Sequence, residues 1–99
     1  MPSVEWRIPA FEQLEALPLS VAFEIVRRVD LLDHFPNAGV KFTRPAALAK
    51  FHQLIVDLNY RVIYEFDDAA DIVWIFAVQH CRRKLPSARD LARARRLTE

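Results

Sequence analysis

The sequence predicts an α+β domain in which a helical hairpin packs on a small, mainly antiparallel four-stranded sheet. Two observations support this fold class. Apolar residues recur every three or four positions over residues 10–32, which is the helical period, whereas residues 51–79 hold runs of β-branched and aromatic residues separated by short acidic turns. The length of 99 residues suits one domain, so we expect residues 1–99 to fold as a single unit.

The N-terminal third is predicted to form one strand and two helices. Residues 4–8 alternate apolar and polar, which is typical of a strand with one buried face. Pro9 ends this strand and suits the first turn of a helix over residues 10–16. A second helix begins at Pro18. Its apolar residues at spacings of four, four and three are expected to face the sheet: Val21, Ile25, Val29 and Leu32.

Three further apolar residues of this region, Phe23, Leu31 and Phe35, do not all fit on that stripe. One interpretation is that a thin sheet needs a wide helical face. The other is that some of them are exposed on the free chain and covered by a helix or strand of a partner.

The second half is predicted to form a three-stranded antiparallel meander after an irregular stretch at residues 40–48. The strands are residues 51–56, 60–66 and 72–79. The last of these is almost entirely apolar, which indicates a central strand that is buried on both faces and has neighbours on both sides. The N-terminal strand is a candidate for its second neighbour, although the sequence does not settle the order.

The C-terminal segment, residues 80–99, is strongly basic. It carries seven Lys or Arg against two acidic residues, a net +5, whereas residues 1–79 carry seven against eleven, a net −4. This asymmetry indicates an anionic partner, either nucleic acid or an acidic protein. Ser87 and Asp90 resemble a capping box at the start of a helix over 88–97. The apolar face of that helix is poor, so we expect residues 80–99 to be partly flexible and the helix to order when a partner binds.

Composition excludes several classes of protein. The single cysteine, Cys81, cannot form an internal disulfide, and no stretch has the roughly 20 apolar residues that a membrane-spanning helix needs. The first residues lack the pattern of a signal peptide. Three histidines and one cysteine form no recognised zinc pattern. We therefore expect a cytoplasmic protein with no metal, no cofactor and no membrane association.

Several segments resemble the RelE/ParE toxin superfamily. Residues 60–66 (YRVIYEF) are similar to the "YRVIY" strand of that superfamily, and residues 78–83 (VQHCRR) to the "V-x-H-x-R-R" ending of its ParE-like members. A first strand with a tryptophan, a helical hairpin and a "P-x-x-G" turn at residues 36–39 complete the pattern. The resemblance covers about residues 4–86 in the right order.

The resemblance implies a toxin of a bacterial type II toxin–antitoxin system, of the kind that serves plasmid stabilization. Such a toxin inhibits growth and is wrapped by an extended or helical segment of a cognate antitoxin in a hetero-oligomer. ParE-like members poison DNA gyrase, whereas RelE-like members are metal-independent endoribonucleases that cut mRNA on the ribosome. A third possibility is a small nucleic-acid-binding module of similar topology.

Three residues are candidates for RNA cleavage, which needs a base, an acid and a cation at the phosphate. Arg61 matches an arginine of the family's third strand and suits the phosphate, unless it pairs with Glu65 or caps the sheet edge. His80 is a candidate acid or base; the alternative is a structural histidine that is hydrogen-bonded near the end of the sheet. His52 is a candidate partner for His80 across the sheet. If the 67–71 turn is symmetric, however, strand alternation predicts that Arg61 and His80 face opposite sides, and a bulge near Gln79 would change that.

A second group of residues suits contact with a target. We expect the cluster formed by Arg82, Arg83 and Lys84, together with Arg61, to bind nucleic acid or an acidic protein surface. Three departures from RNA-cutting members favour the ParE-like function. The strand at 51–56 lacks a lysine pair, no aromatic residue follows Phe76, and Cys81 stands where some of these enzymes have an arginine.

Overall fold

The computed structural model describes residues 2–98 of the chain. A strand, two helices, four more strands and a last helix follow one another, with short 3-10 turns at Leu31–Asp33 and Ala46–Leu48. The α-helices are α1 (Ile8–Glu15), α2 (Leu19–Asp30) and α3 (Ala88–Thr98), and the strands are β1 (Ser3–Trp6), β2 (Val40–Lys41), β3 (His52–Val56), β4 (Tyr60–Asp67) and β5 (Ile72–His80). The α+β class and the helical hairpin are confirmed. No helix in the described range is long and apolar enough to cross a membrane.

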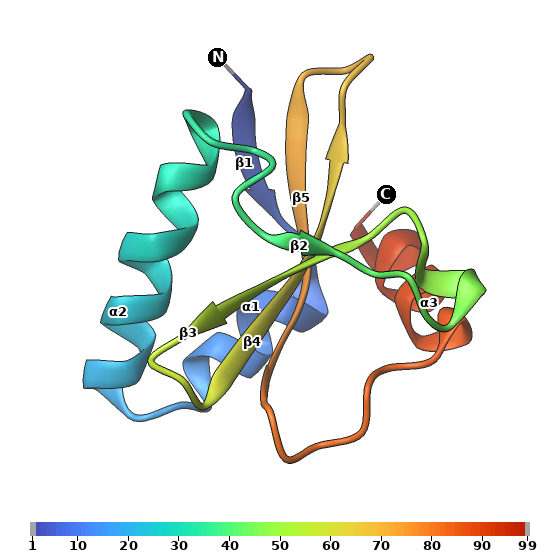
Figure 1. Ribbon diagram of the computed structural model, residues 1–99. Coiled ribbons are helices and arrows are strands. Elements are labelled where there is room, and N and C mark those ends of the chain that lie inside the picture. Colours follow the sequence, from blue (N-terminus) through green and yellow to red (C-terminus); the bar gives the residue numbers. More distant parts are fainter. Residues whose placement is uncertain (1, 99) are drawn as a thin grey trace.

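The sheet has the order β1-β5-β4-β3-β2, in which β1 runs parallel to β5 and the other neighbours are antiparallel (Figure 1). The predicted position of the N-terminal strand beside β5 is confirmed. The prediction of four strands is wrong, because β2 lies in the stretch expected to be irregular and pairs with the start of β3. A strand of two residues is too short to show the alternation of apolar and polar side chains from which strands are predicted. The pairing of β2 instead depends on Gly39, where a Cβ would lie 2.7 Å from the Gln53 carbonyl oxygen.

The register of β4 against β5 decides which side chains share a face. Asp67 lies opposite Ile72, and a bulge follows, because Ile63 pairs with Ala77 while Tyr64 pairs with Ile75. Phe76 is the extra residue, and it packs in the same cluster as Ala77. Beyond the bulge, Arg61 lies opposite Gln79.

One face of the sheet is covered by the helical hairpin. The predicted apolar stripe is confirmed, since Ile25 and Val29 of α2 and Leu32 of the following 3-10 turn are fully buried, and Val21 packs at the margin of this core. Ala10 and Leu14 of α1 join the same cluster. Pro18 precedes α2 as its N-cap residue, as its place in the sequence predicts.

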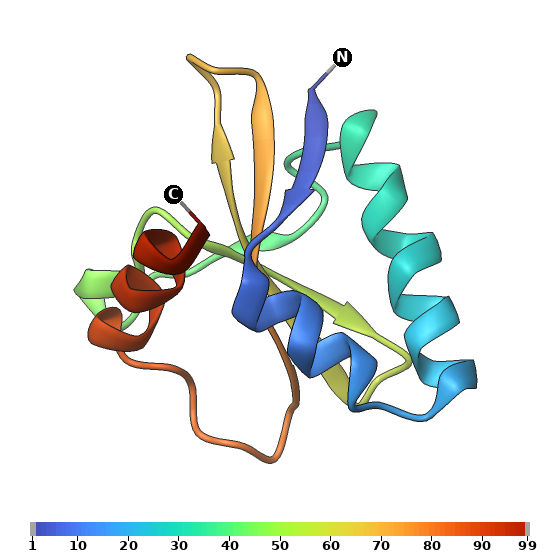
Figure 2. The ribbon, with the colours of Figure 1, turned by 180° about the vertical axis from the view of Figure 1, so that it is seen from behind.

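The opposite face is covered by α3, which lies across the sheet from α2 (Figure 2). The predicted capping box is confirmed, because Asp90 N–H donates to Ser87 Oγ at 3.1 Å and Ser87 N–H donates to the Asp90 carboxylate at 3.0 Å. The hydrogen bond from the Ser87 N–H, followed by interaction with the Ser87 side chain, holds the pKa of the Asp90 carboxyl below its ordinary value. Leu91 and Ala94 are the apolar contacts of α3 with the sheet. In this structure the helix is therefore formed and docked on the sheet.

Candidate functional site

The basic turn after β5 is shaped by His80. The backbone N–H of Arg82 donates to His80 Nδ1 at 3.0 Å, and the N–H of Arg83 donates to the His80 carbonyl at 3.0 Å. The imidazole lies edge-on to the Tyr60 ring, with 5.1 Å between centroids. An Nδ1 that accepts a hydrogen bond carries no proton, so neutral His80 has its proton on Nε2. In this structure His80 therefore organises the turn that carries Arg82, Arg83 and Lys84.

Arg61 holds the same turn from the other face of the sheet. Its Nη2 donates to the carbonyl oxygen of Cys81 at 2.6 Å, and the Cys81 N–H donates to the Asn59 carbonyl at 2.7 Å. Its Nε is buried and has no hydrogen-bond partner within residues 2–98. Of the two structural interpretations, the ion pair with Glu65 is wrong, because Glu65 pairs with other cations. The guanidinium instead bonds the backbone at the end of the sheet.

His52 lies at the far edge of the sheet. Its ring stacks on the Tyr64 ring, with 5.1 Å between centroids and 13° between planes, and Lys41 is its cross-strand neighbour. Burial, followed by the nearby Lys41 ammonium, lowers the pKa of His52 below 6.5. The Tyr64 hydroxyl donates to the Pro36 carbonyl and accepts from the Gly39 N–H, each at 2.8 Å. Neutral His52 thus covers a tyrosine that ties down the loop before β2.

The register separates the three candidate catalytic residues. Arg61 and His80 lie on opposite faces, as predicted. His52 lies opposite Tyr64 and His80 opposite Tyr60, so the two histidines share a face but stand four residues apart along β4. Four residues of a strand span about 13 Å. The hypothesis of an acid–base pair between His52 and His80 is therefore wrong for this conformation.

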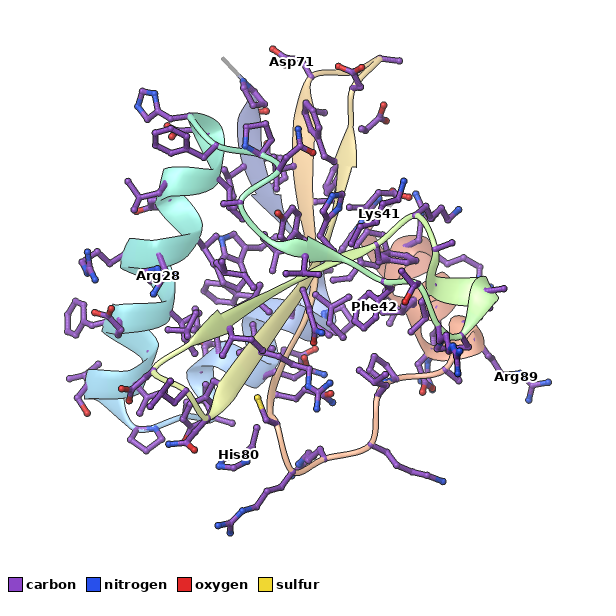
Figure 3. The ribbon with its side chains drawn as sticks, viewed as in Figure 1. Arg28, Lys41, Phe42, Asp71, His80 and Arg89 are labelled. Carbon is purple, nitrogen blue, oxygen red and sulfur yellow. The ribbon has the colours of Figure 1, made fainter. Side chains whose placement is uncertain are left out.

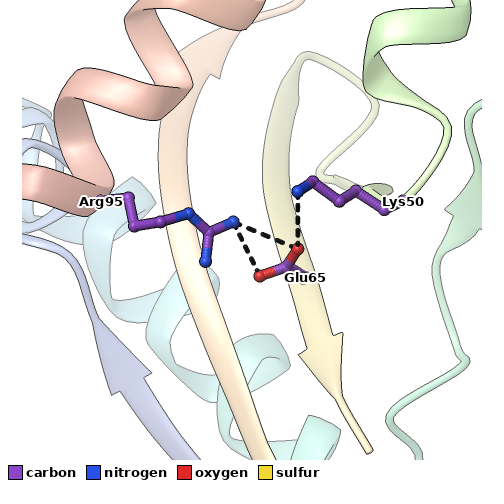
Figure 4. A network of polar contacts seen from close by, with 3 residues as sticks. All are labelled: Lys50, Glu65 and Arg95. Carbon is purple, nitrogen blue, oxygen red and sulfur yellow. Dashed lines mark hydrogen bonds and ion pairs between the residues drawn. The ribbon is translucent and has the colours of Figure 1, made fainter.

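A different cluster of charges gathers between β3, β4 and α3. The Glu65 carboxylate receives two bonds from Arg95 Nη2, at 3.0 and 3.2 Å, and lies 3.9 Å from Lys50 Nζ (Figure 4). The side chain of Glu65 is 13% exposed. Lys41 and His52 line the same cleft, which has a volume of about 560 Å³. The structure thus holds the Glu65 carboxylate between Lys50 and Arg95. His52, in contrast, lies on the other face of the sheet, against Tyr64.

Sequence reasoning missed most of this cleft. The sequence pattern predicts Arg95 only as part of the basic segment 80–99, and Glu65 only as a partner of Arg61. The available signal was the strand alternation that puts Glu65 on the face opposite Tyr64. No local pattern relates Glu65 to Arg95, because thirty residues separate them.

Arg83 and Lys84 also border a groove of about 980 Å³ between α1, β5 and α3. Phe76, Leu91 and Leu97 contribute its apolar surface. Polar groups of α1 reach the sheet here, since Gln13 Oε1 accepts a hydrogen bond from the Val78 N–H at 2.8 Å. The basic turn is therefore continuous with a groove that has both apolar and charged walls.

Large apolar side chains are exposed along α2 and just after it. Leu19 is 74% exposed and Phe23 is 68% exposed. The two lie four residues apart, on one face of the helix. Leu31 and Phe35 are also exposed. The prediction that Phe23, Leu31 and Phe35 do not all fit into the core is confirmed.

Comparison with solved structures supports the fold. The RelBE2 toxin–antitoxin complex of Mycobacterium tuberculosis aligns with a TM-score of 0.70 and 24% identity, over 83% of this chain and 93% of that chain. The isolated E. coli RelE toxin aligns with a TM-score of 0.70 and 16% identity, over 98% and 100%. The archaeal RelE–RelB complex from Pyrococcus horikoshii gives a TM-score of 0.61 and 18% identity, over 84% and 98%. At these identities the likeness concerns the fold.

The sequence comparison is more specific. No curated protein sequence matches the chain. The profile of the family described as the ParE toxin of the type II toxin–antitoxin system, parDE, matches residues 4–85. That range agrees with the span of about residues 4–86 over which the sequence resembles the superfamily. It includes the hairpin, β1 from its second residue, the other four strands and the basic turn. The chain therefore belongs to the ParE toxin family of type II toxin–antitoxin systems, within the RelE/ParE superfamily.

Proposed function

We propose that this chain is a ParE-like toxin that inhibits growth by binding DNA gyrase, without cutting RNA itself. The observation that carries the proposal is the dispersal of the candidate catalytic residues. His52 and His80 lie at distant points of one face, and Arg61 lies on the other face, bonded to the backbone. Metal-free RNA cleavage needs its base, acid and phosphate-binding cation around one bond. A toxin that acts by occupying its target needs no such cluster.

The partner that neutralises the toxin is proposed to be a cognate antitoxin. The similar structures from M. tuberculosis and P. horikoshii are complexes of a toxin with its antitoxin. In this chain the exposed apolar side chains on and after α2 suit cover by a helix or strand of such a partner. Replacing Leu19 and Phe23 together by serine should weaken antitoxin binding in titration calorimetry. The exposed neighbour change Ser20→Ala should leave that binding unaffected.

A supercoiling assay tests the gyrase target directly. Purified gyrase, ATP and relaxed plasmid are incubated with increasing amounts of the chain, and supercoiled product is measured on a gel. We expect supercoiling to fall with the chain alone and to recover when the antitoxin encoded beside it is added first. Full supercoiling in the presence of a large excess of the chain contradicts the proposed function.

A second function is favoured by a separate observation, the cleft around Glu65. Lys41, Lys50 and Arg95 line this cleft together with the carboxylates of Glu65, Asp67 and Asp68. The lowered pKa of His52 keeps its imidazole neutral near pH 7. These groups suit a ribosome-dependent mRNA endonuclease. Primer extension on translated mRNA after induction decides between the two functions. New 5′ ends that disappear in a His52→Gln variant support cleavage, and their absence supports the gyrase proposal.

The third possibility, an unrelated nucleic-acid-binding module, is set aside by membership of the toxin family. Gyrase and the ribosome both work in the bacterial cytoplasm, so we place the chain there. Fractionation of cells that express it should recover the chain with the soluble cytoplasmic proteins.

A further inference from the structure

The turn between β3 and β4 has a strained backbone and carries an exposed leucine, Leu58, at its centre. Asp57 and Leu58 both have positive φ angles, 53° and 62°. Residues with a Cβ avoid this region, and leucine has no polar side chain to bond locally and offset the strain. The turn has three residues, 57–59, because Val56 pairs with Tyr60, and positions with positive φ in hairpin turns favour asparagine and glycine. Leu58 is nevertheless 88% exposed and contributes nothing to either core cluster. The fold therefore does not account for a leucine at this position.

The basic turn after β5 is attached to this strained turn. The Cys81 N–H donates to the carbonyl of Asn59, the residue after Leu58, and Arg61 bonds the Cys81 carbonyl. The contact between the Tyr60 and His80 rings holds the two strands together at the same end of the sheet. The side chains of Arg82, Arg83 and Lys84 are exposed. An apolar tip and three cations thus form one preorganised surface.

We propose that Leu58 and the basic turn, residues 82–84, together form the surface that grips the toxin's protein target. Leu58 would enter an apolar socket whose rim is acidic, and the three cations would face that rim. This inference rests on the proposed function, in which the chain acts by binding a protein. Rigid, preformed contacts of this kind lose little entropy on binding, which is the physical use of a strained tip.

Asp57 favours a protein target over nucleic acid. Its carboxylate is exposed and belongs to the residue next to Leu58. A leucine inserted between bases would bring this negative charge toward the phosphates. An acidic protein rim can instead lie against residues 82–84 while the socket leaves Asp57 in solvent.

The folded target also fits this surface better than the antitoxin does. A socket that encloses one side chain is a concave feature of a folded surface, which a single extended or helical segment does not form. The turn lies beside the N-terminal end of α2 in both views, so the antitoxin remains the competing occupant that an experiment must separate (Figures 1 and 2).

The test uses a substitution that should improve the fold while it weakens the function. Leu58→Asn removes the apolar tip and suits positive φ, so its melting temperature should equal that of the wild type or exceed it by about 2–4 °C. In the supercoiling assay with purified gyrase, half-inhibition should need at least about tenfold more of this variant. Replacing Arg82, Arg83 and Lys84 by glutamine should weaken inhibition as well, most clearly at low salt.

Asp71→Asn is the matched control. Asp71 also has a positive φ, 58°, but lies at the other end of the β4–β5 hairpin from His80 (Figure 3). Asparagine suits its backbone equally well. We expect this variant to inhibit gyrase as strongly as the wild type.

Three results overturn the proposal. The first is Leu58→Asn protein that inhibits as strongly as the wild type. The second is a Leu58→Asn variant that loses antitoxin binding but keeps inhibition, which assigns the tip to the antitoxin. The third is wild-type binding to a labelled 20-base-pair DNA duplex that Leu58→Asn abolishes, which assigns the surface to nucleic acid.

Failure of the proposed function is distinguishable from failure of this inference. If the wild type arrests growth but leaves gyrase active, the gyrase target is wrong. Growth arrest at equal protein abundance then tests the surface, and loss of arrest in Leu58→Asn but not in Asp71→Asn supports it. If the wild type neither inhibits gyrase nor arrests growth, both proposals are wrong.

Discussion

The two faces of the sheet are closed by helices that are attached in different ways. On one face, α2 and the 3-10 turn that follows it insert Ile25, Val29 and Leu32, each fully buried, into a continuous apolar core. On the other, α3 buries only Leu91 and Ala94 among its described side chains. Apolar burial is insensitive to salt, whereas ion pairs near the surface are screened. The comparison therefore predicts that α2 and α3 respond differently to the same perturbations.

Charged groups supply much of the attachment of α3. Arg95 bonds Glu65 and also lies with its guanidinium carbon 5.0 Å from the centre of the Phe76 ring. Beneath α3, Arg7 is 3% exposed, and its guanidinium carbon lies 3.7 Å from the centre of the Trp74 ring. Contacts of cations with aromatic faces contribute about 0.5–2 kcal/mol each, depending on how dry they are. The face under α3 is thus more polar and more dependent on a few specific pairs.

The largest expected effect is on the α2 face. Ile25→Ala removes a fully buried side chain and should lower the free energy of unfolding by about 2–5 kcal/mol, measured by urea denaturation. Phe23→Ala on the exposed side of the same helix should change it by less than about 0.5 kcal/mol. Equal effects of the two substitutions would contradict the apolar attachment of α2.

A smaller and more local effect is expected on the α3 face. Glu65→Gln keeps the shape of the side chain but removes the charge that holds Arg95 and Lys50, which should cost about 1–2 kcal/mol. The substitution should accelerate amide hydrogen exchange more in α3 than in α2. Raising the salt concentration should likewise accelerate exchange in α3 of the wild type. Asp68→Asn, an exposed residue of the same cleft, is the control. Equal acceleration of exchange in both helices would contradict the claim that charged pairs attach α3 but not α2.

The smallest effect concerns pH at the rim of the sheet. The pKa of His52 is lower in the folded chain than the ordinary value of 6.5. At a pH between these two values, the unfolded chain therefore binds a proton at His52 that the folded chain does not. Stability from this residue is therefore present above pH 6.5 and is lost as the pH falls through the folded pKa. Denaturation midpoints measured between pH 7.5 and pH 5 should decline less for His52→Gln than for the wild type. An identical decline in both proteins would show that His52 does not contribute.

Much of the fold follows from local patterns in the sequence. The period of four, four and three places Ile25, Val29 and Leu32 on one side of a helix, and alternation assigns Val62 and Tyr64 to one face of a strand. The pairing of Ser87 with Asp90 locates the start of α3 to the residue. These features depend on residues at most four positions apart, and such short-range geometry is nearly independent of the rest of the chain.

For the candidate site, the sequence alone specifies which residue types lie at the end of β5, and it places Arg61 and His80 on opposite faces only for a symmetric turn without a bulge. Only the tertiary structure decided that Arg61 bonds Cys81, that His52 lies far from His80, and that Glu65 receives Arg95 from thirty residues away. The two-residue strand β2 and the bulge at Phe76 are tertiary features as well, and without that bulge Arg61 would lie opposite Val78, on the same face as His80. The reason is that local sequence sets which face of an element is apolar, whereas packing across the whole sheet selects the register and the distant partners that satisfy its buried charges.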